Sequence, residues 1–206
     1  MADTELPQIY LVTPSVIELS SFPDRLARVL DHAEIACLRL ALASNDEDTV
    51  LRSADVLREV AHARDVAIVI SQHIGLVDRL GLDGVHLTDG TRQVRQARKD
   101  LGADAIVGSF CGASKHDAMT AAEHGADYVS MGPVGASALG DGTTADPDLF
   151  AWWSEMIETP IVAEGNLSGD HMATLAQTTD FFGIGDEIWS QDDPLAALQR
   201  LQSALT

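Results

Sequence analysis

Short apolar runs alternate with amphipathic stretches along the whole chain, about eight times at a spacing of roughly 25 residues. The runs are rich in Val, Ile, Leu and Ala, which predicts buried parallel strands, and the stretches between them predict connecting helices. The predicted strands cover residues 9–12, 36–42, 67–70, 84–87, 105–108, 126–131, 160–163 and 181–184. No composition change marks a linker, so we expect an α/β protein with a single (β/α)8 TIM-barrel domain over residues 1–206.

An open, doubly wound sheet is the structural alternative to a closed barrel. It is disfavoured because no glycine-rich phosphate fingerprint follows the first predicted strand. Only 5% of residues are aromatic while 46% are hydrophobic, which predicts an aliphatic core of the kind that helices build on a parallel sheet.

The chain is acidic, with a formal net charge of −19 and only two lysines, Lys99 and Lys115. Nucleic acid and anionic membrane surfaces are therefore excluded as expected partners, which leaves a small-molecule ligand. The acid excess is also explained by solubility alone. Both lysines fall in predicted helices, away from strand ends, which disfavours an aldolase that works through a lysine Schiff base.

Cys37 and Cys111 are the only cysteines, and their apolar or glycine-rich surroundings indicate reduced thiols in a cytoplasmic protein. The first five residues show no basic region before an apolar core, and no apolar run approaches membrane-spanning length, so we expect neither secretion nor insertion. Trp152 and Trp153 are interpreted as a helix face that packs on the barrel, with a homodimer interface as the alternative.

The strand predicted at residues 36–42 alternates leucines with Cys37, Arg39 and Ala41. If the leucines pack outward against helices, Arg39 points into the barrel, where a cation needs a partner. That partner is either a structural carboxylate or a bound anion.

Ligands of parallel α/β proteins bind at the carboxyl ends of the strands, so residues at the predicted strand exits are the candidate ligand-binding residues. No residue among them can be assigned a catalytic role from the sequence. The candidates are Arg39, Ser71, Gln72, Thr88, Asp89, Cys111, Ser137, Glu164, Gly165, Asn166, Gly185 and Asp186.

Three segments resemble thiamine phosphate synthase and its relative, the thiazole tautomerase: residues 9–13 (IYLVT), 83–87 (DGVHL) and 125–133 (GADYVSMGP). The resemblance runs from about Ile9 to Ile188. It implies a TIM barrel in thiamine biosynthesis, a transferase that joins hydroxymethylpyrimidine diphosphate to a thiazole phosphate. It also implies a magnesium ion that holds the leaving diphosphate.

The ligand positions implied by the resemblance depart from the family pattern. The second-strand motif Gln-x-Arg-x-Lys retains only Arg39, and the Asn-Asp pair after the third strand is Ser71-Gln72. Thr91 stands at the second magnesium carboxylate, with Asp89 two residues earlier, so Asp89 is the one candidate metal ligand. Pro133 stands where the resemblance to the tautomerase implies a catalytic histidine.

The positions that the resemblance assigns to the thiazole phosphate also differ. The Thr-x-Thr-Lys loop corresponds to residues 137–140 (SALG), without a lysine, and the seventh-strand Gly-Gly reads Glu164-Gly165-Asn166. Glu164, Asp186 and Glu187 would each repel a phosphate about 4 Å away by about 4 kcal/mol at an effective dielectric near 20. Asp186 and Glu187, which follow the eighth predicted strand, are expected to cap their own helix and occupy the anion site themselves.

We therefore interpret the chain as a divergent thiamine phosphate synthase-like barrel. It would bind a thiamine-related, uncharged or cationic molecule at the C-terminal rim, with the diphosphate and magnesium sites largely lost. The first alternative is an active synthase with altered ligands, and only that activity calls for magnesium. The second is an unrelated metal-dependent barrel enzyme that uses His73, His86, Asp89, Cys111 and Glu164.

Overall fold

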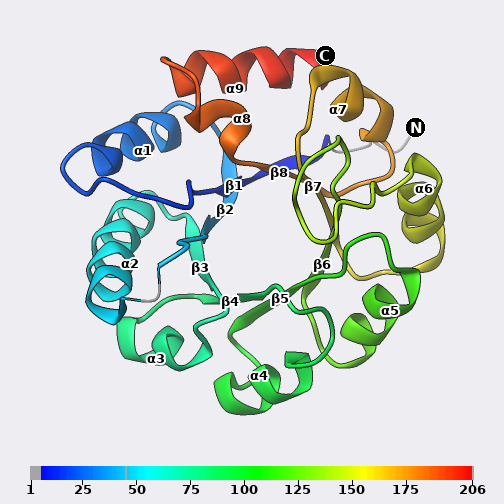
Figure 1. Cartoon of the computed structure of the whole chain (residues 1–206), viewed down its shortest axis with the longest axis horizontal. Helices are drawn as coiled ribbons and strands as arrows, with labels where there is room; N and C mark the ends of the chain where they lie inside the picture. The colour runs from blue at the N-terminus through cyan, green and yellow to red at the C-terminus, as the bar shows by residue number, and fades with distance from the viewer. Residues whose placement is uncertain (1–5, 45, 206) are drawn as a thin grey trace.

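Eight parallel strands close into a barrel in the order of the chain, from β1 next to β2 round to β8 next to β1 (Figure 1). The computed structural model describes residues 6–44 and 46–205. The strands are β1 Gln8–Val12, β2 Ile35–Leu40, β3 Ala67–Ser71, β4 Gly84–Leu87, β5 Ile106–Phe110, β6 Tyr128–Met131, β7 Ile161–Glu164 and β8 Phe181–Ile184. The predicted (β/α)8 barrel is therefore confirmed, and each predicted strand overlaps an observed one.

Helices surround the barrel in a ring (Figure 1). They are α1 Phe22–Leu30, α2 Glu47–His62, α3 Val77–Leu80, α4 Val94–Leu101, α5 Lys115–Glu123, α6 Pro147–Met156, α7 Gly169–Leu175, α8 Asp186–Trp189 and α9 Pro194–Gln202, with short 3₁₀ turns at Ile74–Leu76 and Ser203–Leu205. Ser114 and Ser168 accept hydrogen bonds from backbone N–H groups of the first turns of α5 and α7, as their positions predict. Within the described residues, no helix is long and apolar enough to cross a bilayer.

The side chains of β2 point alternately toward the helices and into the barrel, as predicted. Leu38 and Leu40 belong to the main core between barrel and helices, whereas Cys37 packs with Tyr10 and Tyr128 in a smaller cluster inside the barrel. Arg39 is also buried, so a charged side chain lies within the barrel. This inward cation is the feature on which the functional site is built.

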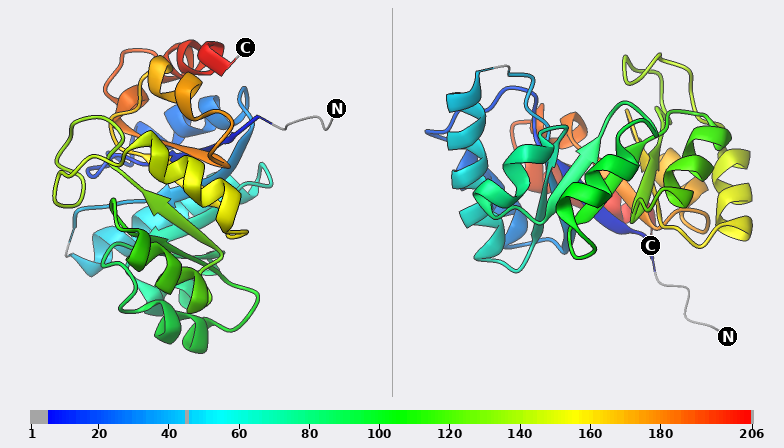
Figure 2. Two further views of the ribbon diagram at one scale, coloured as in Figure 1. Left: turned by 90° about the vertical axis from the view of Figure 1, so that its right-hand side faces the viewer. Right: turned by 90° about the horizontal axis from the view of Figure 1, so that it is seen from below.

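A long loop, residues 132–146, follows β6 and projects from one end of the barrel (Figure 2). Its base is fixed to the exit of β7: the N–H of Val134 donates to the carbonyl of Glu164 at 3.0 Å, and the N–H of Gly135 donates to that of Gly165 at 2.9 Å. Asn166 Nδ2 donates to the carbonyl of Ala136 at 3.0 Å. The loop is thereby held beside the carboxyl ends of β7 and β8.

Several sequence expectations need adjustment. The second strand ends at Leu40 rather than at residue 42, and the fifth extends to Phe110. Trp153 belongs to a helix face that packs on the barrel, as interpreted from the sequence: it is buried, and its indole N–H donates to the carbonyl of Thr159. The expectation for the first five residues lies outside the described residues.

Gly84 is required at the start of β4, because a Cβ there would lie 1.9 Å from the backbone oxygen of Ile106 on β5. We expect Gly84→Ala to lower the free energy of unfolding by about 2–4 kcal/mol, since the backbone of a central strand must move. Gly75→Ala is the matched control because its Cβ would meet no atom within 4 Å. Urea unfolding of both variants measures the difference, and equal stabilities would contradict the close approach.

Candidate functional site

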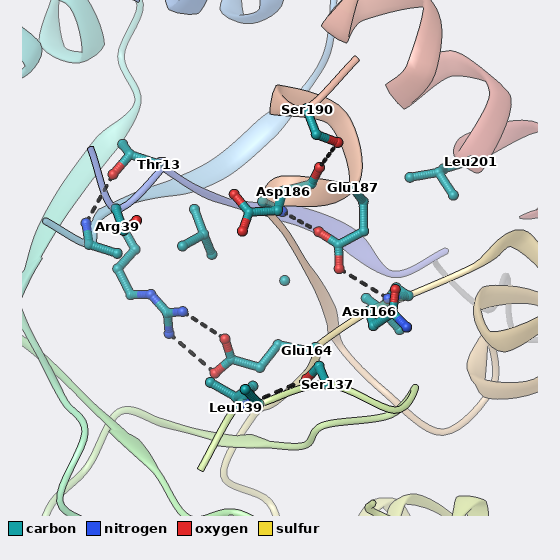
Figure 3. Close-up of a pocket in the computed structure, with 18 of the residues that line it drawn as sticks. Thr13, Arg39, Ser137, Leu139, Glu164, Asn166, Asp186, Glu187, Ser190 and Leu201 are labelled. Atoms are coloured by element: carbon teal, nitrogen blue, oxygen red, sulfur yellow. Dashed lines mark hydrogen bonds and ion pairs between the residues drawn. The ribbon is translucent and has the colours of Figure 1, made fainter. Parts of the chain in front are cut away.

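A cleft of about 850 Å³ opens at the carboxyl ends of the strands, above β1, β2, β7 and β8 (Figure 3). The loop after β6 and the chain around α8 and α9 complete its walls. The cleft is lined by Val12, Thr13, Ser15, Arg39, Ala41, Ala136, Ser137, Ala138, Leu139, Glu164, Gly165, Asn166, Leu167, Gly183, Gly185, Asp186, Glu187, Ser190, Gln191 and Leu201.

Arg39 and Glu164 form a bidentate ion pair at the floor of this cleft. Arg39 Nη1 donates to Glu164 Oε1 at 3.2 Å and Nη2 donates to Oε2 at 2.6 Å, and the residues are only 7% and 3% exposed. Ser130 Oγ donates to the same carboxylate at 2.5 Å. The carboxylate is thus the partner that an inward arginine requires, and the guanidinium charge is compensated within the chain.

The pair holds both groups in their charged forms. Burial by itself would raise the pKa of Glu164, but the charge and hydrogen bonds of Arg39 outweigh it and lower that pKa to about 2. Burial likewise would lower the pKa of Arg39, and the nearby Glu164 raises it instead. Glu164 is therefore an anion throughout the physiological range.

A chain of hydrogen bonds runs from the ion pair into the barrel interior. Arg39 Nη1 lies 2.7 Å from His86 Nε2, His86 Nδ1 lies 2.9 Å from the Tyr128 hydroxyl, and that hydroxyl lies 2.5 Å from the hydroxyl of Tyr10. Arginine can only donate, so His86 Nε2 accepts and Nδ1 carries the proton toward Tyr128. Burial, together with the charge of Arg39, lowers the pKa of His86 well below its usual value, which keeps the ring neutral.

Glu187, on α8, holds two backbone N–H groups at the other side of the cleft. Its Oε2 accepts from Gly185 at 2.7 Å and its Oε1 accepts from Leu167 at 3.0 Å (Figure 3). The side chain links the loop after β8 to the loop after β7. The expectation that a carboxylate occupies these amides is confirmed for Glu187, whereas the neighbouring Asp186 is exposed.

Seven of the twelve candidate residues line this cleft: Arg39, Ser137, Glu164, Gly165, Asn166, Gly185 and Asp186. The other five lie at the exits of β3, β4 and β5. Gln72 donates to Thr88, Asp89 Oδ2 accepts from Gln93 Nε2 at 2.9 Å, and Ser71 ends β3. Cys111 is buried, and burial raises the pKa of its thiol to about 12, so it is no activated nucleophile.

Sequence reasoning left several lining residues out of the candidate set. Thr13 and Ser15 follow β1, and Ser190, Gln191 and Leu201 come from the chain that folds back over β8. Their composition gives no signal, because their position depends on how α8 and α9 pack against the barrel. Glu187, which lies two residues after Gly185, did carry a signal in the sequence. A carboxylate close to a glycine at a strand exit is a potential acceptor for backbone N–H groups.

The residues proposed for an unrelated metal enzyme do not form a metal site. Throughout the described part of the chain, no three His, Cys, Asp or Glu residues are close enough together to hold a metal ion. His86 and Glu164 instead contact Arg39, and Cys111 is a buried thiol. One atom does suit a cation: Asp89 Oδ1 is buried and has no hydrogen-bond partner among the described residues.

The model of a protein family described as thiamine monophosphate synthase matches residues 9–182. The chain belongs to this family. Thiamine-phosphate synthase from Rhodospirillum centenum is 39% identical over 93% of this chain and 94% of its own, and that from Erythrobacter litoralis is 36% identical over 95% of each. Thiamine phosphate pyrophosphorylase from Pyrococcus furiosus superposes with a TM-score of 0.83, at 18% identity over 96% and 95% of the two chains, and so supports the fold.

Membership of the thiamine monophosphate synthase family confirms the resemblance seen in the sequence. The two bacterial relatives support the first alternative, an active synthase, better than our leading interpretation of a barrel that has largely lost its diphosphate site. Any account of activity must accommodate the buried ion pair between Arg39 and Glu164.

The first test of the site concerns Glu164. We expect Glu164→Gln to lower the free energy of unfolding by about 3–5 kcal/mol, because Arg39 would be left as an uncompensated buried charge. The double variant Arg39→Met with Glu164→Gln should recover most of this loss. The matched control is Glu47→Gln, which breaks an exposed pair with Arg79 and should cost less than about 1 kcal/mol.

Equal losses in the Glu164 and Glu47 variants, measured by chemical denaturation, would contradict a structural role for the buried pair.

His86 generates a pH prediction. Its pKa is depressed in the folded protein, so below about pH 6.5 the unfolded chain binds a proton that the folded chain does not. The free energy of unfolding should therefore fall as pH decreases from about 6.5, with this one group contributing up to about 1.4 kcal/mol per pH unit. The contribution should disappear in His86→Gln. Parallel pH profiles for wild type and variant between pH 7 and 5 would show that His86 takes up its proton without unfolding.

Proposed function

We propose that this protein is a transferase of the thiamine phosphate synthase type. It joins the methylene carbon of hydroxymethylpyrimidine diphosphate to the ring nitrogen of a thiazole and releases diphosphate. The observation that carries the proposal is the end-to-end similarity, at 36–39% identity, to two relatives named thiamine-phosphate synthase. A fold hosts many activities, so the cleft must also suit the reaction.

Arg39 supports diphosphate binding in spite of its partner. Its Nε–H is buried and has no acceptor among the described residues, although buried donors are nearly always satisfied. Both Nη atoms face Glu164, so a substrate oxygen could accept from Nε without breaking the ion pair. In this proposal Arg39 orients the diphosphate, and Glu164 fixes the guanidinium rather than removing it.

Asp89 supports a magnesium ion. Magnesium commonly uses only one or two protein carboxylates when substrate phosphates supply the other oxygens. The unpartnered Oδ1 of Asp89, at the exit of β4, fits that role, and the absence of a larger acidic cluster in the described residues does not oppose it. When bound, the ion would neutralise charge on the departing diphosphate.

The proposal is tested by supplying hydroxymethylpyrimidine diphosphate, magnesium and a thiazole, as phosphate or alcohol, and measuring the thiamine products by fluorescence after oxidation. We expect turnover, and we expect Asp89→Asn to raise the half-saturating magnesium concentration at least about tenfold. Asp104→Asn, an exposed carboxylate beyond α4, is the matched control and should match the wild type. A folded protein with no turnover from either thiazole would contradict the proposal.

A second candidate function, binding without turnover, is favoured by the charge of the cleft. Glu164 compensates Arg39, and Asp186 and Glu187 add two further carboxylates. Such a cleft attracts a cationic thiazolium ring. Absence of turnover combined with measurable binding of thiamine would support this candidate.

A further inference from the structure

Arg39 makes more contacts than the compensation of its charge requires. Its two Nη atoms donate to both carboxylate oxygens of Glu164 (Figure 3), and Nη1 also donates to His86 Nε2 at 2.7 Å. The guanidinium lies over the ring of Tyr10, with its Cζ 5.7 Å from the ring centroid. Since Glu164 already compensates the charge, the contact with His86 acts on the orientation of the guanidinium.

The ion pair is anchored to the barrel from two sides. Glu164 alone would tie the guanidinium only to a carboxylate, because both groups end side chains that can rotate. Ser130, on β6, donates to Glu164 Oε1 at 2.5 Å, and His86, on β4, accepts from Arg39. These two contacts hold the carboxylate and the guanidinium to separate strands, so the direction of the Arg39 Nε–H bond is fixed.

The acceptor role of His86 depends on Tyr128. A neutral imidazole accepts at Nε2 only when its proton is on Nδ1, and His86 Nδ1 lies 2.9 Å from the hydroxyl of Tyr128, which can accept from it. The two rings are stacked, with centroids 5.8 Å apart and planes inclined by 21°. His86 is fully buried, so solvent does not compete for either ring nitrogen.

We infer that His86 is a positioning residue: it holds the guanidinium of Arg39 in the orientation that leaves Nε–H to donate to a diphosphate, and Tyr128 fixes the tautomer that makes this possible. The Nε–H has no acceptor among the described residues. The inference rests on the function proposed above for the part that concerns turnover. A histidine that only filled the core would not affect anion binding in this way.

The first experiment determines the tautomer directly and needs no substrate. Long-range proton–nitrogen correlation spectra of protein with isotope-labelled histidine show which ring nitrogen carries the proton, and the signals missing from His86→Gln identify His86. We expect a neutral ring at about pH 7 with its proton on Nδ1. A proton on Nε2, or a charged ring, would overturn the inference, because neither form can accept from Arg39.

The second experiment measures the Kd of inorganic diphosphate, in the presence of magnesium, by calorimetry. We expect His86→Phe to raise this Kd at least about tenfold, because the acceptor for Arg39 is lost and small displacements of a binding group are costly. His86→Gln should stay within about threefold of wild type, since its amide oxygen can accept in place of Nε2. Tyr128→Phe should weaken binding less than His86→Phe does, because it removes only the group that fixes the tautomer.

Val162→Ala is the matched control for these variants. Val162 packs in the same interior cluster as Tyr128, and its truncation removes core volume without removing a hydrogen bond, so its Kd should equal that of wild type. If His86→Phe fails to fold, His86→Asn makes the same comparison, because its shorter side chain cannot reach Arg39.

The inference would be overturned by an unchanged Kd in His86→Phe, by equal weakening in Val162→Ala, or by a folded wild type that binds no diphosphate. An unchanged Kd in Tyr128→Phe would overturn the role assigned to Tyr128.

Steady-state kinetics separate positioning from general damage to the cleft. We expect His86→Phe to lower kcat/KM for hydroxymethylpyrimidine diphosphate at least about tenfold while the KM for the thiazole stays within about twofold of wild type. A parallel rise in the KM for the thiazole would overturn the inference. If wild type shows no turnover, the transferase proposal fails, whereas the tautomer and the series of Kd values still decide the role of His86.

Discussion

The structure depends on a positive charge placed inside the barrel. A buried guanidinium is tolerated only when its charge and its donors are satisfied, and Glu164 meets most of that requirement from the end of β7. Ser130 and His86 form hydrogen bonds to the ion pair, and the hydrogen bonds continue from His86 to Tyr128 and Tyr10 inside the barrel. The interior is consequently polar at its centre, and the charge that reaches the cleft is much smaller than a free arginine would provide.

At the carboxyl end of the barrel, a carboxylate of the chain takes the place of a bound anion at two positions. Glu164 compensates the cation of β2, and Glu187 satisfies N–H groups that a substrate anion could otherwise use. The fold therefore retains the form of an anion-binding rim while the chain supplies its own anions. Membership of the thiamine monophosphate synthase family and the named bacterial relatives favour catalysis, so the compensation is better understood as tuning of the site than as its loss.

Much of the architecture could be predicted because strands and helices impose local periods on the sequence. Alternation in β2 placed Arg39 inside the barrel and the leucines outside, and the apolar runs located the eight strands. Strand ends shifted by a few residues, because hydrogen bonding to neighbouring strands sets them. The candidate residues gathered at one rim, yet five of the twelve lie outside the cleft, since a strand exit fixes the end of the barrel but not the position around it.

The sequence by itself determined the alternation of strands and helices and the acidic charge. It also determined the buried arginine and the carboxylates at positions where phosphate contacts are expected, because all of these follow from residue type and spacing. Only the tertiary structure decided which charges meet. Glu164 is 125 residues from Arg39 along the chain, and Leu167 is 20 residues from Glu187, so barrel closure and the packing of α8 were needed to pair them. Coulomb and hydrogen-bond energies depend on distances of a few ångströms, which local sequence patterns do not encode.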